Sequence, residues 1–444
     1  MADGITAQLA EFICSFESRL LSPDQILTAK SCILDWSAVA LAGRDEPVSR
    51  IVREMASSEG GTPEAMVIGL ADRLPARTAA LSNGTTSHAL DYDDTHFDHI
   101  GHSSVGIFPA VLALGEALGR DGREVLDAFV IGLEVACRVG RYLGNGHYRH
   151  GFHQTATAGA FGAAAASARL LRLDEERCGH TLGLVSTRAS GLKSQFGTMG
   201  KPFHAGLAAS NGVEAAKLAS LGFISNPQGL ECVQGFADTH AGEGDAQTPF
   251  DGLGQTFRFD RVQFKHHACC HGTHAPIDAL KALRSKIGPE AAQARSIVLR
   301  VHPQWLRVCN ILSPATGLEA KFSFRLTSAM ALAGRDTAAL ETFCDAACAD
   351  PDLAQLRDRV TVETDDALGS IEALAIVELP DGRHLEHHCD LAEPVDAALT
   401  RTRLVEKAEA LIGHPAAATL LETVDTLDTS ERFTLPDVLA SLGA

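Results

Sequence analysis

The chain has 444 residues, 45% hydrophobic and 21% charged, which is typical of a folded globular protein long enough for two domains. Its formal net charge of −18 at pH 7 argues against nucleic acid and anionic membranes as partners, because both require a basic face. The eleven cysteines include no CxxC pair, and neither a signal peptide nor a run of about 18 apolar residues is evident, so we expect a cytoplasmic protein without a membrane span.

The first half of the chain is predicted to be helical. Aromatic residues are scarce and Gly and Ala abundant, a mixture that favours closely packed helices. Ser22 is expected to be the N-cap of a helix with Pro23 in its first position, followed by the apolar run 26–42. Further helices are expected at residues 77–90, 107–118, 124–139, 155–171, 175–187 and 205–221.

The pattern changes after residue 264. Alternating β-branched residues predict strands at 296–301 and 359–364, and residues 371–379 and 383–389 predict a hairpin around Pro380-Asp381-Gly382. Helices are expected at 274–287, 322–333 and 340–349, and again from about 404. The predicted fold is therefore mainly α, with a large all-helical domain at 1–262, a smaller α+β lid domain at 263–405, and a tail at 406–444 that rejoins the first domain.

Residues 88–102 (HALDYDDTHFDHIGH) form the densest polar cluster of the sequence. A solvated surface would carry Lys and Glu, whereas this segment holds four aspartates and four histidines. A buried aspartate could orient a histidine for acid–base chemistry, or the side chains could bind a divalent metal. The segment has no HExxH motif and lacks the Gly and Glu of an EF-hand loop. A polar loop that caps a helix near residues 103–104 is the third possibility.

Residues 147–155 (HYRHGFHQT) form a second candidate. If a helix begins at Thr155, its free backbone N–H groups could bind an anion, and Arg149 could clamp a carboxylate through two hydrogen bonds. The alternative is a set of surface histidines before a helix.

Residues 197–206 (GTMGKPFHAG) resemble a phosphate-binding loop superficially, but no glycine precedes Gly200 by five residues and Pro202 replaces the Ser or Thr. Lys201 opens an apolar helix, and desolvation there could lower its pKa towards that of a useful base. The alternative is an ordinary surface lysine.

Residues 265–274 (KHHACCHGTH) lie at the expected domain junction. Thiol and imidazole groups could bind zinc, although the spacing is not the usual one, or a thiolate beside imidazoles could act as an acid or base. A buried thiol pair before a helix start is the structural alternative.

Taken together and in this order, these segments resemble the MmgE/PrpD family. The matching stretches are HALDYDDTH…GHSS, GFHQTATAGAFGAAAASARLL, GTMGKPFHAGLAASNGVEAAKLASLGF, KHHACCHGTHAPIDA and EAKFSF. The resemblance as a whole extends from about residue 5 to about residue 430. The resemblance implies an all-α domain with a smaller α+β lid, a pocket between them, a homodimer, and no metal or organic cofactor. The family includes 2-methylcitrate dehydratase, cis-aconitate decarboxylase and iminodisuccinate epimerase, which all act on small polycarboxylates.

The resemblance also implies site residues. The acidic and Thr positions of the first motif fall on Asp91 and Thr95, and the following His falls on His102; the later motifs supply His153, Lys201 and His204. Together with the anion site described above, the expected catalytic residues are Lys201, His102, Asp91, Cys270 and His153, and the expected substrate-binding residues are Thr95, Tyr148, Arg149, His204 and His274.

Two positions depart from the decarboxylase-like members of the family. Cys270 stands where those members carry a histidine, and a tyrosine that they carry after the first strand of the lid is absent, with Trp305 or Leu306 nearby. Two groups of similar basicity across a pocket suit epimerisation, with Cys270 facing Lys201 or His102. The expected function is therefore a cofactor-independent epimerase that removes and returns the proton on the carbon α to a carboxylate, as in iminodisuccinate. The alternatives are a 2-methylcitrate dehydratase-type lyase, a cis-aconitate decarboxylase, and a helical binding protein without enzymatic activity.

Overall fold

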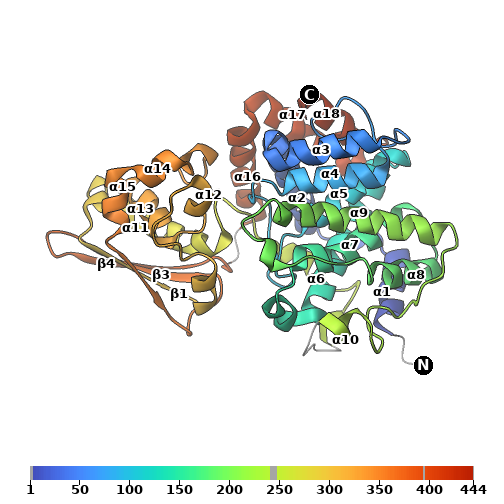
Figure 1. Ribbon diagram of the computed structural model, residues 1–444, viewed down its shortest axis with the longest axis horizontal. Helices are drawn as coiled ribbons and strands as arrows, with labels where there is room; N and C mark the ends of the chain where they lie inside the picture. Colours follow the sequence, from blue (N-terminus) through green and yellow to red (C-terminus); the bar gives the residue numbers. More distant parts are fainter. Residues whose placement is uncertain (1–3, 241–247, 394–395, 444) are drawn as a thin grey trace. The chain divides into compact units, whose positions relative to one another are not determined.

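The computed structural model describes residues 4–240, 248–393 and 396–443, and it divides the chain into two compact units (Figure 1). Unit 1 consists of Met1–Phe264 and Leu404–Ala444, and unit 2 of Lys265–Arg403. The two units are described separately below. The prediction of a mainly helical fold is confirmed.

The regular elements in the described part of unit 1 are helices. Seven of them carry or support the candidate site: α2 (Pro23–Ala42), α4 (Ala76–Ser87), α5 (Ser104–Ala117), α6 (Gly122–His150), α7 (Gln154–Leu170), α9 (Gly200–Ser220) and α16 (Ala397–Ile412). The others are α1 (Ile5–Ser15), α3 (Pro47–Glu59), α8 (Glu175–Val185), α10 (Phe236–His240), α17 (His414–Asp425) and α18 (Leu435–Gly443).

Helix α2 begins as its sequence predicts. The Ser22 hydroxyl accepts a hydrogen bond from the Gln25 backbone, the Gln25 side chain accepts one from the Ser22 backbone, and Pro23 occupies the first helical position. The segment Pro23–Asp45 has a mean hydropathy of 1.3 and passes a length-and-composition test for a membrane span, which the sequence analysis does not anticipate. Because 78% of its most apolar stretch is buried, it has the position of a core helix.

The core of unit 1 is built on close contacts between small residues. Every residue of α7 except Arg169 is buried, and α7 packs beside α6, α5 and α9 (Figure 1). Helices α4 and α9 approach at Gly84 and Gly206, where a Cβ added to Gly84 would lie 2.8 Å from the Cα of Gly206. This contact brings the end of α4 beside the first turns of α9, which carry Lys201 and His204.

Several element boundaries differ from the prediction. Helix α6 continues to His150 instead of ending near 139, with a kink at Gly144, whose φ is 68°. Helix α9 begins at Gly200 instead of 205, so Lys201 lies in its first turn. Helix α3 is missing from the prediction, because its apolar face is narrow. The helix expected at 340–349 is a 3₁₀ turn at Leu340–Thr342 and a short helix α14 (Asp345–Ala349).

Unit 2 contains a four-stranded sheet in the order β2-β1-β3-β4. Strand β1 (Ser296–Val301) pairs parallel with β2 (Val360–Thr364) and antiparallel with β3 (Glu372–Glu378). The predicted hairpin is confirmed: β3 pairs antiparallel with β4 (His384–Asp390) around Pro380-Asp381-Gly382, where Gly382 has φ 87°. Alternate residues of β1 and β3 are buried, so one face of the sheet is covered.

Helices cover that face of the sheet. They are α11 (His274–Ile287), α12 (Gly317–Ala320), α13 (Phe324–Ala333), α14 and α15 (Pro351–Arg357), and Figure 1 shows them on the side of the sheet opposite its open face. Helix α11 packs on β3 and β4, and α13 packs on β2. The parallel pair β1–β2 needs a crossover connection, which α12 to α15 provide. Unit 2 is therefore an α+β structure.

Candidate active site

The candidate site of unit 1 begins in the loop that joins α4 to α5. The loop carries the predicted polar cluster, and most of its aspartates and histidines are buried. Asp91 has φ 53°, in the left-handed region that Asp tolerates better than most residues. This conformation follows the end of α4 at Ser87 and turns the chain so that Asp91 and Asp93 both reach His102.

Asp93 links two histidines. Its Oδ1 lies 2.9 Å from Nδ1 of His88, and its Oδ2 lies 2.6 Å from Nδ1 of His102. The side chains of Asp93 and His88 are completely buried, while that of His102 is 10% exposed. Because a carboxylate only accepts, both Nδ1 atoms are expected to carry the proton that they donate to Asp93. The carboxylate therefore fixes the orientation of the His102 ring.

Asp91 links His102 to Lys201. The Oδ1 atom of Asp91 lies 3.2 Å from Nε2 of His102 and 2.7 Å from Nζ of Lys201, and all three side chains are between 10% and 21% exposed. The three residues come from the α4–α5 loop and from the first turn of α9. From the sequence, Lys201 is expected to be able to act as a base, and in the structure its Nζ forms an ion pair with Asp91. Lys201 is arranged here as a cation.

Electrostatic effects give the two buried members of this cluster, Asp93 and His88, different charges. Burial alone would raise the pKa of Asp93, but the charges and hydrogen bonds of His102 and His88 outweigh it, and its pKa lies well below the usual range. Burial lowers the pKa of His88 to about 4, although Asp93 acts in the opposite direction. At neutral pH Asp93 is therefore an anion and His88 is neutral.

A second pair of histidines lies beside this cluster. His153, the residue before α7, has its Nδ1 3.1 Å from Nδ1 of His204 on α9, and its ring lies 6.2 Å from that of His88. Burial, followed by the charge of Lys201, holds the pKa of both His153 and His204 below the usual value. The edge of Phe196 packs against His153, with ring centroids 4.9 Å apart. The pair is therefore neutral and able to donate hydrogen bonds.

The carboxylate–histidine cluster also has the spacing of a metal site. One ligand atom from each of His88, Asp91, Asp93 and His102 lies within 4.8 Å of the others. However, Asp93 is already in close contact with both imidazoles, and Asp91 is paired with Lys201. A divalent ion would have to displace the lysine and two ring protons, so the donor set fits a proton-transfer site better than a metal centre. The absence of a required metal stays a prediction.

The remaining predicted residues of unit 1 have contacts of their own. The backbone of Thr95 exchanges two hydrogen bonds of 2.8 Å with that of Gln263. Tyr148 lies beneath the ammonium of Lys193, 3.5 Å from Nζ to the ring centroid, and Arg149 is exposed at the end of α6. Helix α7 does begin near Thr155, as the anion site requires, but the carboxylate clamp by Arg149 stays a prediction.

The junction segment lies in unit 2. The half-buried Cys270 donates its backbone N–H to the carbonyl of Lys321, and His274 at the start of α11 stacks with His271 at 4.7 Å. Burial, then the neighbouring histidines, keep the pKa of His274 well below the usual value. Trp305 packs against Gly272. The region in which the family's tyrosine is absent therefore lies beside this segment. The pairing of Cys270 with Lys201 or His102 joins residues of different units and stays a prediction.

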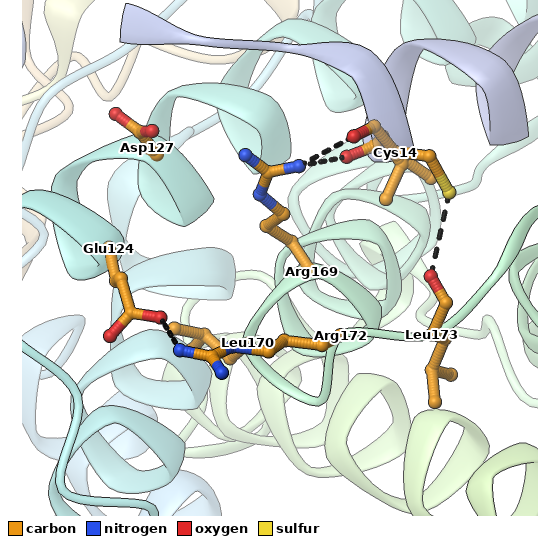
Figure 2. Close-up of a pocket in the computed structure, with 8 residues that line it drawn as sticks. Cys14, Glu124, Asp127, Arg169, Leu170, Arg172 and Leu173 are labelled. Carbon is orange, nitrogen blue, oxygen red and sulfur yellow. Dashed lines mark hydrogen bonds and ion pairs between the residues drawn. The ribbon is translucent and has the colours of Figure 1, made fainter.

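A cavity of about 360 Å³ elsewhere in unit 1 holds none of the predicted residues (Figure 2). It is lined by residues of α1, α6 and α7 and of the turn after α7. Figure 2 shows Arg169 donating to the carbonyl end of α1, at Ile13 and Cys14, and Arg172 paired with Glu124. Because its arginines are engaged in these structural contacts, we do not place the active site there.

The sequence analysis does not select three residues of the site: His88, Asp93 and Phe196. The first two belong to the segment that it identifies, but the spacing in DYDD does not reveal which carboxylate points inward. Phe196 lies in an irregular segment without a recognisable pattern. Its place beside His153 depends on the pairing of the Phe152 and Leu192 backbones.

Comparisons with known proteins give matches over most of the chain. Two family models match the chain: the MmgE/PrpD N-terminal domain over residues 7–249 and the MmgE/PrpD C-terminal domain over residues 267–428. The human cis-aconitate decarboxylase is 30% identical over 377 residues, which cover 82% of this chain and 77% of the human protein. The mouse cis-aconitate decarboxylase is 30% identical over 75% of this chain and 70% of its own length. The cis-aconitate decarboxylase of Aspergillus terreus is 29% identical over 64% of this chain and 61% of its own length.

Proposed function

Because the chain belongs to the MmgE/PrpD family, we propose that it is a lyase that removes CO2 from a small tricarboxylate of the cis-aconitate type, by proton transfer and without a cofactor. The similar curated relatives named above are cis-aconitate decarboxylases, which favours a lyase over the epimerase expected from Cys270. The observation that carries the proposal is the joint contact of Lys201 and His102 with one oxygen of Asp91.

The reaction makes two demands on the site. The bond between a carbon and its carboxylate breaks, CO2 leaves, and the electron pair stays on the carbon skeleton, where cations or hydrogen bonds must stabilise it. A proton must then be added to carbon. The ammonium of Lys201 supplies the positive charge beside Asp91, and the neutral His153 and His204 supply hydrogen bonds for the other carboxylates of the substrate.

His102 is the proton donor in this proposal. Both of its ring nitrogens lie beside carboxylate oxygens, an arrangement that suits a doubly protonated ring. The Nδ1 proton stays on His102, beside the ionised Asp93, while the Nε2 proton at the partly exposed edge passes to the substrate carbon. The Asp93–His102 pair thus has the division of labour of a carboxylate that orients a catalytic imidazole.

The direct test is turnover in D2O followed by NMR. With cis-aconitate, we expect loss of CO2 and an unsaturated dicarboxylate that has gained one deuteron at carbon. Lys201→Met should lower kcat on the order of 10²–10⁴-fold, because the charge that stabilises the transition state is removed. Lys217→Met is the matched control, since Lys217 lies on the same helix and is ion-paired with Glu64 away from the cluster.

Other outcomes of the same experiment separate the remaining reactions. The epimerase is the second candidate, favoured by the thiol at position 270, and it predicts deuterium exchange with stereochemical scrambling of iminodisuccinate. Loss of water from 2-methylcitrate would indicate a dehydratase. No turnover of any of the three substrates would contradict an enzyme of this reaction class.

A chelator tests the cofactor-free part of the proposal. The geometry of the four possible ligands leads us to expect the same kcat before and after dialysis against EDTA, because Lys201 and the imidazole protons already neutralise both carboxylates. Loss of turnover on dialysis, restored by a divalent cation, would show instead that the cluster binds a metal.

A further inference from the structure

Lys407 is a buried lysine that the proposed reaction does not use. It lies on α16, in the part of the helix that belongs to unit 1, and its side chain is only 4% exposed. Its ammonium donates to Oδ1 of Asp35 on α2 at 2.6 Å and to the backbone carbonyl of Tyr92 at 2.7 Å. It also lies 4.0 Å from the centroid of the Tyr92 ring. The ammonium of Lys407, in the C-terminal part of the chain, therefore contacts both the backbone carbonyl and the ring of Tyr92.

Tyr92 occupies a particular place in the sequence. It stands between Asp91, which contacts Lys201 and His102, and Asp93, which orients His102. The backbone of Asp91 is in the left-handed region, so the segment needs contacts that hold it in this conformation. A hydrogen bond to the Tyr92 carbonyl fixes the peptide between the two carboxylates.

The buried pair is not explained by stability. Removing an ammonium and a carboxylate from water costs more than their attraction commonly returns, and apolar residues of the same volume often serve as well. The side chain of Asp35 is 1% exposed, and burial raises its pKa even though Lys407 opposes the shift. Asp94 is buried close by, and burial, followed by the charge of Asp35, raises its pKa to about 6. Burying the charged groups of Asp35 and Lys407 beneath the α4–α5 loop costs free energy, which suggests that they have a role in the candidate site.

We propose that Lys407, held by Asp35, is a positioning residue that fixes Asp91 and Asp93 through the backbone of Tyr92. It touches no reacting atom. The prediction for turnover rests on the proposed function above, whereas the placement of the His102 ring does not.

A matched pair of variants tests the proposal. Lys407→Met should lower kcat about a hundredfold with a small change in KM, because a displacement of about 1 Å of catalytic groups costs that much. Lys30→Met is the control: Lys30 also joins α2 to the C-terminal part of the chain, bonding Asp428 at 2.6 Å and the carbonyl of Asp425 at 2.7 Å. It should lose comparable stability and keep its kcat.

A double variant separates positioning from folding. In Lys407→Met/Asp35→Leu no buried charge is left alone, so the melting temperature should recover towards that of the wild type. The kcat should stay low, because the Tyr92 carbonyl still lacks its donor. Recovery of both quantities together would assign Lys407 a purely structural role.

The last measurement does not require turnover. The ¹⁵N shifts of the His102 ring report whether both nitrogens carry protons, and they should change in Lys407→Met but not in Lys30→Met. If the wild type decarboxylates nothing, the proposed function fails while this comparison still decides the positioning role. Identical His102 spectra and equal kcat in the wild type and Lys407→Met would overturn it.

Discussion

At the scale of single residues, Asp93 contacts Nδ1 of both His88 and His102 through its two carboxylate oxygens and thereby orients both rings. The His88 ring is buried behind it, and the His102 ring is partly exposed in front. Asp93 thus orients His102, the group that we propose as proton donor. His88 completes the arrangement by holding the other oxygen of Asp93.

The substitution Asp93→Asn tests this role. It keeps the shape of the side chain but removes the negative charge beside Nδ1 of His102 and turns an N–H donor towards one of the two imidazoles, so the His102 ring should lose its charged partner and its orientation. We expect kcat to fall on the order of 10³-fold with little change in KM, measured by initial rates on the substrate found by NMR. An unchanged kcat would exclude Asp93 as the orienting group.

The variant Asp93→Asn should also change how the free energy of unfolding depends on pH. The pKa of Asp93 is depressed in the folded protein, so its ionised form stabilises the fold above about pH 4, the ordinary aspartate value. That contribution is lost as the pH falls below this value, towards the pKa of the folded state. Urea unfolding between about pH 5 and about pH 3 should show the additional loss in the wild type and not in Asp93→Asn.

At the scale of elements, the site depends on how closely α4 and α9 approach. The Cβ of a residue at position 206 would overlap the carbonyl oxygen of Leu81 on α4. A glycine there lets the two helices touch through their backbones, and this contact brings the start of α9 to the loop after α4. The Gly- and Ala-rich composition predicts such packing in general, but it does not predict which helices touch.

Gly206→Ala should therefore lower both the stability of the protein and its kcat. We expect a loss of about 1–3 kcal/mol, because the added methyl group meets backbone atoms that cannot move aside, and a lower kcat as Lys201 shifts from Asp91. Gly179→Ala is the control on α8, where the new Cβ would lie 3.4 Å from Pro227, an ordinary contact distance. It should stabilise by about 0.5–1 kcal/mol, because it removes the entropy cost of a helical glycine. Thermal unfolding of both variants checks the opposite signs.

At the scale of the whole molecule, buried histidines link stability to pH. His99 is completely buried, and burial, followed by the charge of His96, lowers its pKa to about 3. The unfolded chain binds a proton at this residue below about pH 6.5 and the folded protein does not, so stability is lost as the pH falls from about 6.5 towards about 3.

The variant His99→Leu isolates this effect from the other titrating groups. Between about pH 6.5 and about pH 5 the wild type should lose about 2 kcal/mol more of its free energy of unfolding than the variant, at about 1.4 kcal/mol per pH unit. Urea unfolding at both pH values gives the difference. His150→Gln, at an exposed ring, should behave like the wild type, and parallel curves for the wild type and His99→Leu would contradict the argument.

Local sequence patterns were sufficient to predict the helical class, the hairpin at 371–389, the cap of α2 and the family of the protein. These rest on local patterns: hydrophobic periodicity, a turn signal, a capping box and ordered motifs. The same patterns identified Asp91, His102, His153, Lys201 and His204 as candidates. Turning Lys201 from an expected base into a paired cation required its distance to Asp91.

Only the tertiary structure decided which polar groups meet. Residues 88, 93, 201 and 407 come together because α4, α9 and α16 pack around a loop in which Asp91 and Ile100 both have left-handed backbone conformations. Sequence spacing carries no information about contacts between residues hundreds of positions apart, such as Asp35 and Lys407. Burial in the packed unit then makes His88 neutral, while the charges and hydrogen bonds of His102 and His88 keep Asp93 ionised.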